Sequence, residues 1–469
     1  MAATLKHIRT FRRTGQADIL LGWATRTAQS DALYQWNSST GWTFIAALTG
    51  TNLIYSSVVW KNRVYWVDGK NALQAWDGSA ICTLSAQAPV GQYIVVYQAR
   101  LVIGGDARLI PSEVSEVNTN RNLVVYSEAL DDSQWSPNNF IQCDIVGDGH
   151  SISGLGVVSA GTSDQGAQQT LAVFHPHATL LHQGVLGSGD VQLNIVSKVR
   201  GCPGYNTITN TPFGLMYLAS NQEGGTQPTV CLLAPGNSGE PAEVGLPIST
   251  NIAAMTTDAM RVQSAAIFHD GMYKLSFDGL ATGTNNTYEW WLDLRQTAFP
   301  QENNWYGPHT GDNILQYEIF GGNLIAAELG TSRVWKVDVT GLYGSMTASG
   351  TPRTSTMIWP RLRIGNQKKG SLDAYGISGQ LAASAVLTGS VDIDRGTYTI
   401  ADTFTAPASL PANTPMYALI RPIHRYEGHD AKITLSHSAN SDVVVDSVYV
   451  RSLQRQPKQT VKQTSSSQT

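Results

Sequence analysis

The sequence predicts an all-β fold, a β-propeller followed by a β-sandwich, and three observations lead to this prediction. A strand-turn-strand unit recurs across the first 350 residues, most clearly at 58–78, 265–279 and 317–338. Asp-Gly pairs, which favour tight hairpins, punctuate these units at 68–69, 77–78, 148–149, 270–271 and 278–279. Eleven of the twelve tryptophans precede residue 350, so these large flat side chains lie in the part of the chain where the unit recurs.

One such unit is a small antiparallel sheet that cannot bury its own faces, so the copies must stack, and a closed ring of stacked sheets is a propeller. We expect the tryptophans to fill the gaps between blades. Residues 16–350 predict seven blades, with six as the alternative because the fourth and fifth units are irregular. The units are expected at about 16–49, 50–90, 91–147, 148–205, 206–258, 259–310 and 311–350.

Residues 351–452 predict a separate domain. About seven alternating strands with short turns suffice for a C-terminal β-sandwich. The segment 351–356, rich in Thr, Pro and Ser, is the expected linker. Residues 453–469 form a polar tail that has too few apolar residues to fold in isolation.

Residues 1–15 predict a basic N-terminal arm. This segment lacks the apolar core of a secretory signal peptide, although it has the basic character of a transit peptide. We expect it to bind an acidic partner through Lys6, Arg9, Arg12 and Arg13. No stretch approaches 18 apolar residues, so no membrane span is predicted.

The charge of the chain is low and unevenly distributed. Charged residues make up 14% of the chain, against roughly 25% in ordinary soluble domains. A polar, uncharged surface suits permanent contact with partners, and a secreted β-protein with polar loops is the alternative. Residues 1–350 hold 18 basic and 27 acidic residues, a balance of −9. That balance argues against a propeller that grips nucleic acid, because neutralising phosphates needs a basic face.

The candidate metal-binding and redox residues favour structural roles. Without a CxxC pair or zinc spacing, we expect buried free thiols at Cys82, Cys143, Cys202 and Cys231, with a disulfide as the alternative. Four histidines fall in one unit, where metal binding would need further ligands, so we expect polar loop positions for His150, His175, His177 and His182. The sequence therefore predicts no metal and no cofactor.

No catalytic constellation stands out. Paired carboxylates could serve glycoside hydrolysis, but Glu128, Asp131 and Asp132 beside Trp135 are more typical of a capped turn. The segment 38–42 lacks the aspartate and spacing of a sialidase Asp-box, and there is no GxSxG, Walker or dinucleotide motif. We therefore predict that the protein is not an enzyme.

Two alternative functions remain open at the sequence level. One is a glycan-binding or glycan-degrading propeller, secreted or carried on a virion, whose aromatic platform would be Trp290-Trp291 or Trp305-Tyr306. The other is an intracellular scaffold of the WD or kelch type, which ranks last because the glycine and Trp-Asp signatures of those repeats are missing.

Two local stretches carry a resemblance to a known family. YQARLVIGGD (97–106) is followed by NLVVYSEALDDSQWS (122–136), an apolar strand with Arg, a strand ending in Tyr-Ser and an acidic turn before Trp. Toward the C-terminus, MIWPRLRIGN (357–366), SVDIDRGTYTIADTFTA (390–406) and VVVDSVYVRS (443–452) form a strand-rich module. In these stretches and in the order of its parts, the chain resembles the β-propeller tail hub, or nozzle, proteins of short-tailed bacteriophages, the packaged-DNA stabilisation type.

The resemblance implies a structural protein of the virion, made in the host cytoplasm and without catalytic residues. Such a protein forms a ring, usually of six copies, that extends the channel of the portal and adaptor proteins. It retains packaged DNA, conducts it at infection without binding it specifically, and contacts tail fibres or spikes.

Overall fold

In the computed structural model, contacts divide the chain into two compact units, and each is described by itself. The first comprises residues 1–339 and 343–351, and the second comprises residues 340–342 and 352–469. The residues that the structure describes are 3–82, 84–85, 87–105, 107, 122–144, 147, 149–159, 169–188, 192–220, 228–236, 239–255, 261–280, 283, 285–295, 305–310, 312–337, 344–345, 354–358, 362–363, 370–381, 386–393, 398–405, 415–420, 426–428, 430–437 and 443–453.

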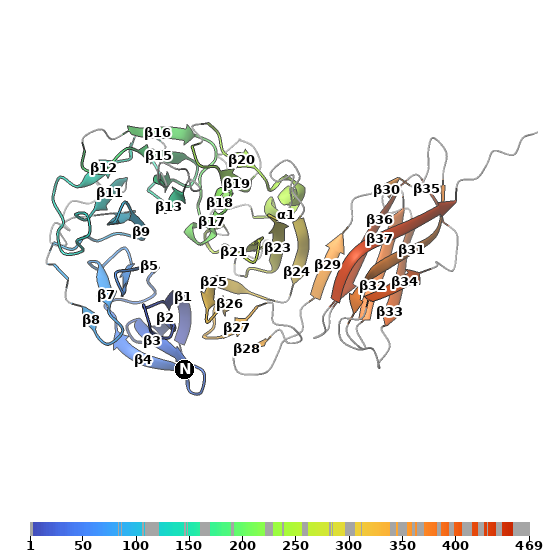
Figure 1. Ribbon diagram of the computed structural model, residues 1–469, viewed down its shortest axis with the longest axis horizontal. Coiled ribbons are helices and arrows are strands. Elements are labelled where there is room, and N and C mark those ends of the chain that lie inside the picture. The colour runs from blue at the N-terminus through green and yellow to red at the C-terminus, as the bar shows by residue number, and fades with distance from the viewer. Residues whose placement is uncertain are drawn as a thin grey trace, which may run out of the picture. The chain divides into compact units, whose positions relative to one another are not determined.

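The first unit is a seven-bladed β-propeller (Figure 1), so the prediction of seven blades is confirmed and the alternative of six is wrong. Each blade contains four antiparallel strands that follow one another in the sequence and pair in that order. Blades 1 to 4 are β1–β4 (Ala3–Phe11, Ile19–Arg26, Ala32–Asn37, Gly41–Ala47), β5–β8 (Ser56–Trp60, Arg63–Val67, Gln74–Trp76, Ile81–Cys82), β9–β12 (Tyr93–Tyr97, Arg100–Gly104, Leu123–Tyr126, Phe140–Gln142) and β13–β16 (Gly154–Ser159, Gln169–Phe174, Thr179–Gln183, Gln192–Ser197). Blades 5 to 7 are β17–β20 (Thr209–Thr211, Gly214–Ala219, Thr229–Leu233, Ala242–Glu243), β21–β24 (Ala265–His269, Met272–Phe277, Tyr288–Asp293, Trp305–Thr310) and β25–β28 (Ile314–Phe320, Asn323–Glu328, Val334–Lys336, Gly344–Ser345).

Two-residue turns of one conformation connect the first and second strands of four blades. Both residues of each turn have a positive φ, the geometry whose twist matches that of the flanking strands. Asparagine, aspartate and glycine tolerate this conformation best, and they occupy five of the eight positions. The turns are Lys61-Asn62, Gln98-Ala99, Asp270-Gly271 and Gly321-Gly322.

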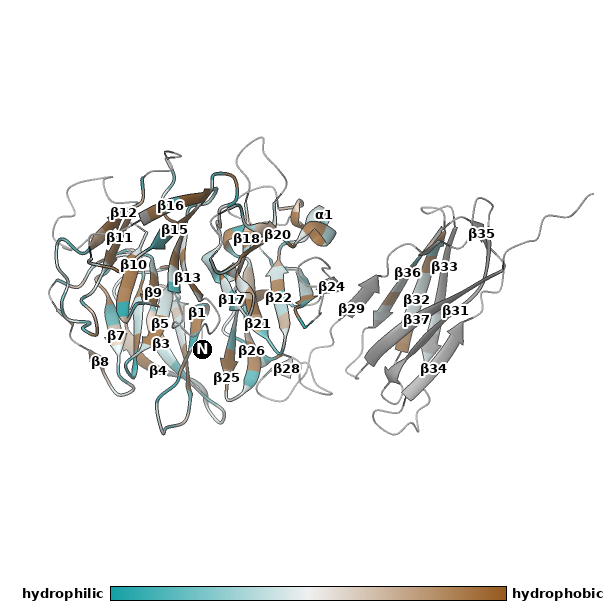
Figure 2. Ribbon diagram, turned by 45° about the horizontal axis from the view of Figure 1, so that its top comes forward, coloured by the Kyte–Doolittle hydropathy of each residue, from teal (hydrophilic) through white to brown (hydrophobic). Residues whose placement is uncertain are grey.

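Hydrophobic clusters fill the gaps between neighbouring blades, and within the described residues each of the seven gaps has one. Between blades 1 and 2, for example, Trp23 packs edge-on against Trp66 with ring centroids 5.7 Å apart. The expected role of the tryptophans is confirmed for the four that are at most 2% exposed, Trp23, Trp66, Trp76 and Trp135. Figure 2 shows hydrophobic residues along the strands of the ring.

The ring closes without exchange of strands between its ends. Instead, backbone N–H groups of β1 bond to blade 7: Leu5 donates to the carbonyl of Thr331 (2.8 Å) and Ile8 to Oε1 of Gln316 (3.0 Å). The indole N–H of Trp42 donates to the carbonyl of Ser332 (2.9 Å). We call these contacts between blades 1 and 7 the seam.

The expected basic arm at 1–15 needs correction, because residues 3–11 form β1, the inner strand of blade 1. Leu5, Ile8 and Phe11 are buried in the clusters beside it, and their burial makes this segment part of the ring.

The second unit also consists of β-strands. One set pairs in the order β29 (Thr354–Ile358), β36 (Asp430–His437), β32 (Val386–Ile393) and β33 (Tyr398–Thr405), with β30 (Leu362–Arg363) also on β36. In the other set, β31 (Gly370–Leu381) pairs with β34 (Pro415–Ile420), β35 (Tyr426–Gly428) and β37 (Val443–Leu453). Side chains of the second set lie outside the described residues, so the β-sandwich at 351–452 stays a prediction. Residues 454–469 of the predicted polar tail also lie outside them.

All four cysteines are free, as expected. Cys143, Cys202 and Cys231 are buried, whereas Cys82 is partly exposed. Among the described residues, no helix is long and apolar enough to cross a membrane.

Candidate binding cavity at the propeller axis

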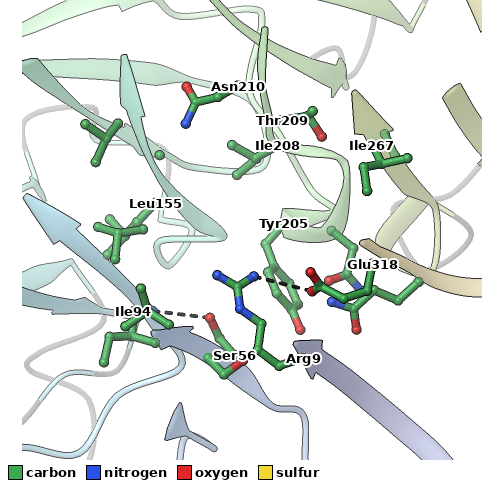
Figure 3. Close-up of a pocket in the computed structure, with 18 of the residues that line it drawn as sticks. Arg9, Ser56, Ile94, Leu155, Tyr205, Ile208, Thr209, Asn210, Ile267 and Glu318 are labelled. Atoms are coloured by element: carbon green, nitrogen blue, oxygen red, sulfur yellow. Dashed lines mark hydrogen bonds and ion pairs between the residues drawn. The ribbon is translucent and has the colours of Figure 1, made fainter. Parts of the chain in front are cut away.

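A cavity of about 440 Å³ lies where the blades meet (Figure 3). All seven first strands, β1, β5, β9, β13, β17, β21 and β25, contribute lining residues, so the cavity sits on the axis of the ring. Its volume falls in the range of about 300–1,000 Å³ that is typical of small-molecule sites. The closed ring therefore creates a concave site that no single blade contains.

An ion pair lies in this cavity and spans the seam. Nη1 of Arg9 on β1 is 3.7 Å from Oε2 of Glu318 on β25, and the two side chains are 34% and 15% exposed. Burial raises the pKa of the Glu318 carboxyl, and the charge of Arg9 partly offsets that rise. A separation of 3.7 Å is longer than a hydrogen bond but too short to admit a ligand atom between the two groups, so a ligand would bridge them from one side.

His7 lies beside Arg9 but adds no charge at neutral pH. It is 3% exposed, and its Nε2 shares a hydrogen bond of 2.7 Å with the hydroxyl of Ser57 on β5. Burial first, and then the positive charge of Arg9, lower the pKa of His7 to about 3. On the neighbouring strand, the hydroxyl of Ser56 accepts the backbone N–H of Ile94 at 3.3 Å. The charges in the lining therefore reduce to one cation and one anion.

Tyr205 crosses the axis. It belongs to a short 3₁₀ turn, η2 (Tyr205–Thr207), just before blade 5, yet its hydroxyl donates to the carbonyl of Tyr55 just before blade 2. Its ring also contacts Tyr93 of blade 3, with centroids 5.2 Å apart. The axial space is consequently interrupted by a side chain at this level (Figure 3).

The remaining lining divides into two chemical kinds. Hydroxyl and amide groups come from Ser56, Ser57, Asn206, Thr209, Asn210 and Gln316, and aliphatic side chains come from Ile94, Val96, Leu155, Val157, Ile208 and Ile267. A wall of this composition can bind a compact molecule that has polar edges and an apolar face.

Of the four basic residues predicted to bind a partner, Arg9 lines the cavity and the others do not. Arg12 is 59% exposed, pairs with Asp18 at 3.8 Å and donates to the carbonyl of Ile319 at 3.2 Å. The guanidinium of Arg13 lies 5.3 Å from the ring centre of Phe11. Lys6 is partly exposed on β1. Partner binding by Lys6, Arg9, Arg12 and Arg13 stays a prediction.

The sequence did not predict two central residues of the cavity, Glu318 and Tyr205. A signal for Glu318 exists, because it is a lone acidic residue within the apolar strand Ile314–Phe320, where a charge needs a partner. No comparable signal marks Tyr205.

The acidic group at 128–132 joins blades 2 and 3. Oδ2 of Asp132 accepts from Nη1 of Arg63 (2.8 Å) and from the hydroxyl of Tyr65 (2.7 Å), while its backbone carbonyl accepts the indole N–H of Trp135 (3.0 Å). We call Asp132, Arg63, Tyr65 and Trp135 the clamp.

The two neighbouring carboxylates have local partners. Asp131 caps the turn through the backbone N–H of Ser133 at 2.9 Å, as predicted, and Glu128 pairs with Arg100 at 3.2 Å. Hydrogen bonds from Asn139 and then Arg100 lower the pKa of Glu128, and bonds from Ser133 lower that of Asp131. A general acid in glycoside hydrolysis needs a raised pKa, so these two carboxylates are unsuited to that role.

His150, His175 and His177 lie in loops, as expected, whereas His182 lies on a strand. His182 lies on β15 and His175 directly after β14, and both are 0% exposed. Edge-on packing joins His150 and His177, with ring centroids 4.9 Å apart, and His177 shares a hydrogen bond of 3.2 Å with Ser220. Among the described residues, no group of three or more His, Cys, Asp or Glu side chains is arranged to hold a metal ion.

The proposed aromatic platforms are largely packed into blade 6. The indole N–H of Trp305 donates to the carbonyl of Val244 at 2.8 Å, and its ring meets Tyr273 edge-on. Trp290 is 7% exposed, and Lys274 lies 3.8 Å from the ring centre of Trp291. Tyr306, at 40% exposed, is the most accessible of the four.

Comparisons with solved structures return matches of low similarity. The computationally designed Ika8 protein has 11% identity and a TM-score of 0.38, over 71% of this chain and 83% of its own. A lectin from Aleuria aurantia in complex with α-methyl-L-fucoside has 10% identity and a TM-score of 0.32, over 88% of this chain and 97% of its own. An exo-β-1,3-galactanase from Phanerochaete chrysosporium has 10% identity and a TM-score of 0.27, over 95% of each chain. These values are too low to support an inference about function. No protein-family model matches the sequence, and neither does any curated protein.

Proposed function

We propose that this chain is a structural, non-catalytic component of a phage tail, a hub or nozzle protein that extends the portal-adaptor channel. The observation that carries the proposal is the role of the stretch on which the resemblance rests. Residues 97–106 and 122–136 contain β10 and β11 of blade 3, and the acidic turn before Trp135 supplies the clamp to blade 2. The stretch that carries the resemblance therefore helps to hold blade 3 against blade 2.

Strong contacts between neighbouring blades suit a protein that forms the wall of a DNA channel and must resist mechanical force. Each gap between blades is filled by a hydrophobic cluster, and the clamp and the seam add directed hydrogen bonds. Because the clamp joins side chains of different blades, blades 2 and 3 cannot separate without breaking bonds to a charged acceptor, of which the bond from the Tyr65 hydroxyl contributes about 1.5–3 kcal/mol.

The position of Tyr205 indicates where the DNA path of such a hub would lie. The axial space is lined by side chains of all seven blades and crossed by Tyr205, so the axis of one propeller cannot serve as a DNA channel. DNA would instead pass through the centre of a ring of several copies, six in the family that the chain resembles. The acidic balance of residues 1–350 would limit adhesion of DNA to that wall.

Electron microscopy of the full chain mixed with a portal-adaptor complex tests this proposal. We expect negative-stain images to show rings of the full chain on the adaptor, and Arg12→Glu to reduce their occupancy. Lys70→Glu, an equal charge change on an exposed side chain of blade 2, is the matched control. Persistent monomers with bare adaptors would overturn the proposal.

A second candidate function is glycan binding, and the axial cavity favours it. The cavity has the size of a small-molecule site and a lining of hydroxyl, amide and aliphatic groups. A glycan array with labelled full chain tests this candidate, and an empty array would reject it. Trp305→Ala is unsuitable as the diagnostic variant, because Trp305 holds the carbonyl of Val244 and its loss would disturb the fold.

A further inference from the structure

The charge pattern of the axial cavity restricts what it can bind. Arg9 and Glu318 cancel, and His7, the titratable residue beside them, is neutral at ordinary pH. A phosphate or carboxylate attracted to Arg9 would meet the Glu318 carboxylate a few ångströms away, and a cation attracted to Glu318 would meet Arg9. The electrostatics therefore favour a ligand without net charge.

The shape of the lining restricts the ligand further. About 440 Å³ is near the lower end of the usual range for ligand sites, which favours one ring over an extended chain. Hydroxyl and amide groups, including Thr209 and Asn210, lie near an aliphatic wall that includes Leu155 and Ile208 (Figure 3). A sugar ring has this same division, with hydroxyl groups at its edge and C–H groups on its face.

We propose that the axial cavity binds one neutral sugar ring, with a pair of adjacent hydroxyl groups that bridge the Arg9 guanidinium and the Glu318 carboxylate from the side of the cavity. One hydroxyl accepts from Arg9 and the other donates to Glu318, so each charged group gains a charge-assisted hydrogen bond. Asn210 supplies a further amide, and Val157 and Ile208 cover the apolar face. This inference rests on glycan binding, the second candidate function, and it is independent of assembly into a tail.

Titration calorimetry on the full chain tests the assignment, using D-glucose, D-galactose, L-fucose, D-glucuronate, inorganic phosphate and L-alanine as probes. We expect saturable binding of at least one neutral sugar and at least tenfold weaker binding of glucuronate and phosphate. A zwitterionic amino acid could also bridge Arg9 and Glu318. Binding of L-alanine without any neutral sugar would therefore overturn the proposal.

Variants locate the site. Arg9→Gln and Glu318→Gln should each weaken sugar binding about tenfold or more, because a hydrogen bond to a charged group contributes about 1.5–3 kcal/mol. Arg12→Gln is the matched control, three residues along the chain from Arg9, directly after β1 and outside the lining, and it should bind as the wild type does. Arg9 and Glu318 also belong to the seam, so Asn210→Ala and the cavity-filling Val157→Trp provide a test that leaves it intact.

The outcomes separate the inference from the functions proposed above. Binding lost in Asn210→Ala and Val157→Trp, with an unchanged thermal transition, supports the axial site. Sugar binding that none of the four variants changes would overturn it while leaving glycan binding in place elsewhere on the protein. Flat titrations with every neutral sugar would overturn it outright and leave the tail-hub proposal untouched.

Discussion

Replacing Asp132 with alanine should loosen blade 3 from blade 2. The change removes the acceptor of the Tyr65 hydroxyl (2.7 Å) and of Nη1 of Arg63 (2.8 Å). Tyr65 is 0% exposed, so its hydroxyl would lose a charged partner in a place that offers little water. The backbone carbonyl of residue 132 still accepts the indole N–H of Trp135 in the variant, so any loss of stability comes from the missing carboxylate alone.

The two lost contacts have different weights. A buried hydrogen bond to a charged acceptor contributes about 1.5–3 kcal/mol. The Arg63 side chain is 41% exposed, so its ion pair adds at most about 1 kcal/mol. We therefore expect Asp132→Ala to lower the free energy of unfolding by about 2–3 kcal/mol. Asp132→Asn keeps a neutral acceptor for Tyr65 and should lose less.

Urea denaturation followed by tryptophan fluorescence measures this loss. Eleven of the twelve tryptophans precede residue 350, so the fluorescence change reports unfolding of the propeller and contains little contribution from the second unit. Asp131→Ala is the matched control, since that neighbouring carboxylate bonds only within its own exposed turn. The reasoning is refuted if Asp132→Ala is no less stable than Asp131→Ala.

Three further predictions concern the seam and the thiols. Burial lowers the pKa of His7 to about 3, so between pH 6.5 and 3 unfolded chains bind a proton at this residue that folded chains do not. The free energy of unfolding should therefore fall on acidification across that window. The fall should be smaller in His7→Gln. Trp42→Phe should lose about 1 kcal/mol in urea denaturation with its bond to Ser332, whereas Trp36→Phe, whose indole N–H has no partner, should lose less. Iodoacetamide followed by mass spectrometry should modify Cys82 alone in the native protein, and slowly, because burial raises the pKa of its thiol.

The blades could be predicted from the sequence because most of them combine apolar strands with turn residues at short spacing. The fourth and fifth were the hardest to recognise. In blade 5, every residue of β18 and β19 is buried, so these strands lack the alternation of a sheet with one wet face. Neighbouring blades cover both faces there, and only the closed ring explains the pattern.

The N-terminal strand was misjudged for a local reason. A bulge between Leu5 and His7 shifts the register of β1 against β2, so buried residues do not alternate regularly along 3–11. Lys6 and Arg9 then stand out as a basic stretch, although Leu5 and Ile8 are fully buried beside them. A segment with this many basic residues resembles a basic arm until the pairing of β1 with β2 is known.

The cavity could not be predicted from local patterns, because its central pair comes from the two ends of the repeat. Arg9 is on the first strand of blade 1 and Glu318 on the first strand of blade 7, and only closure of the ring brings them within 3.7 Å. Tyr205 reaches Tyr55 across a separation of 150 residues in the sequence. Such contacts form only when the ring closes, and the order of strands along the sequence does not show which distant residues then meet.

The axial position of the cavity links ligand binding to the integrity of the ring. A ligand held between Arg9 and Glu318 would contact both sides of the seam, where the ring closes through side-chain and backbone bonds instead of a shared strand. Binding to the folded state alone stabilises it by about 2.7 kcal/mol at a ligand concentration one hundred times Kd. Because opening the seam would separate the two groups that bind the ligand, occupancy of the cavity would oppose opening at the one junction between blades that no covalent loop spans.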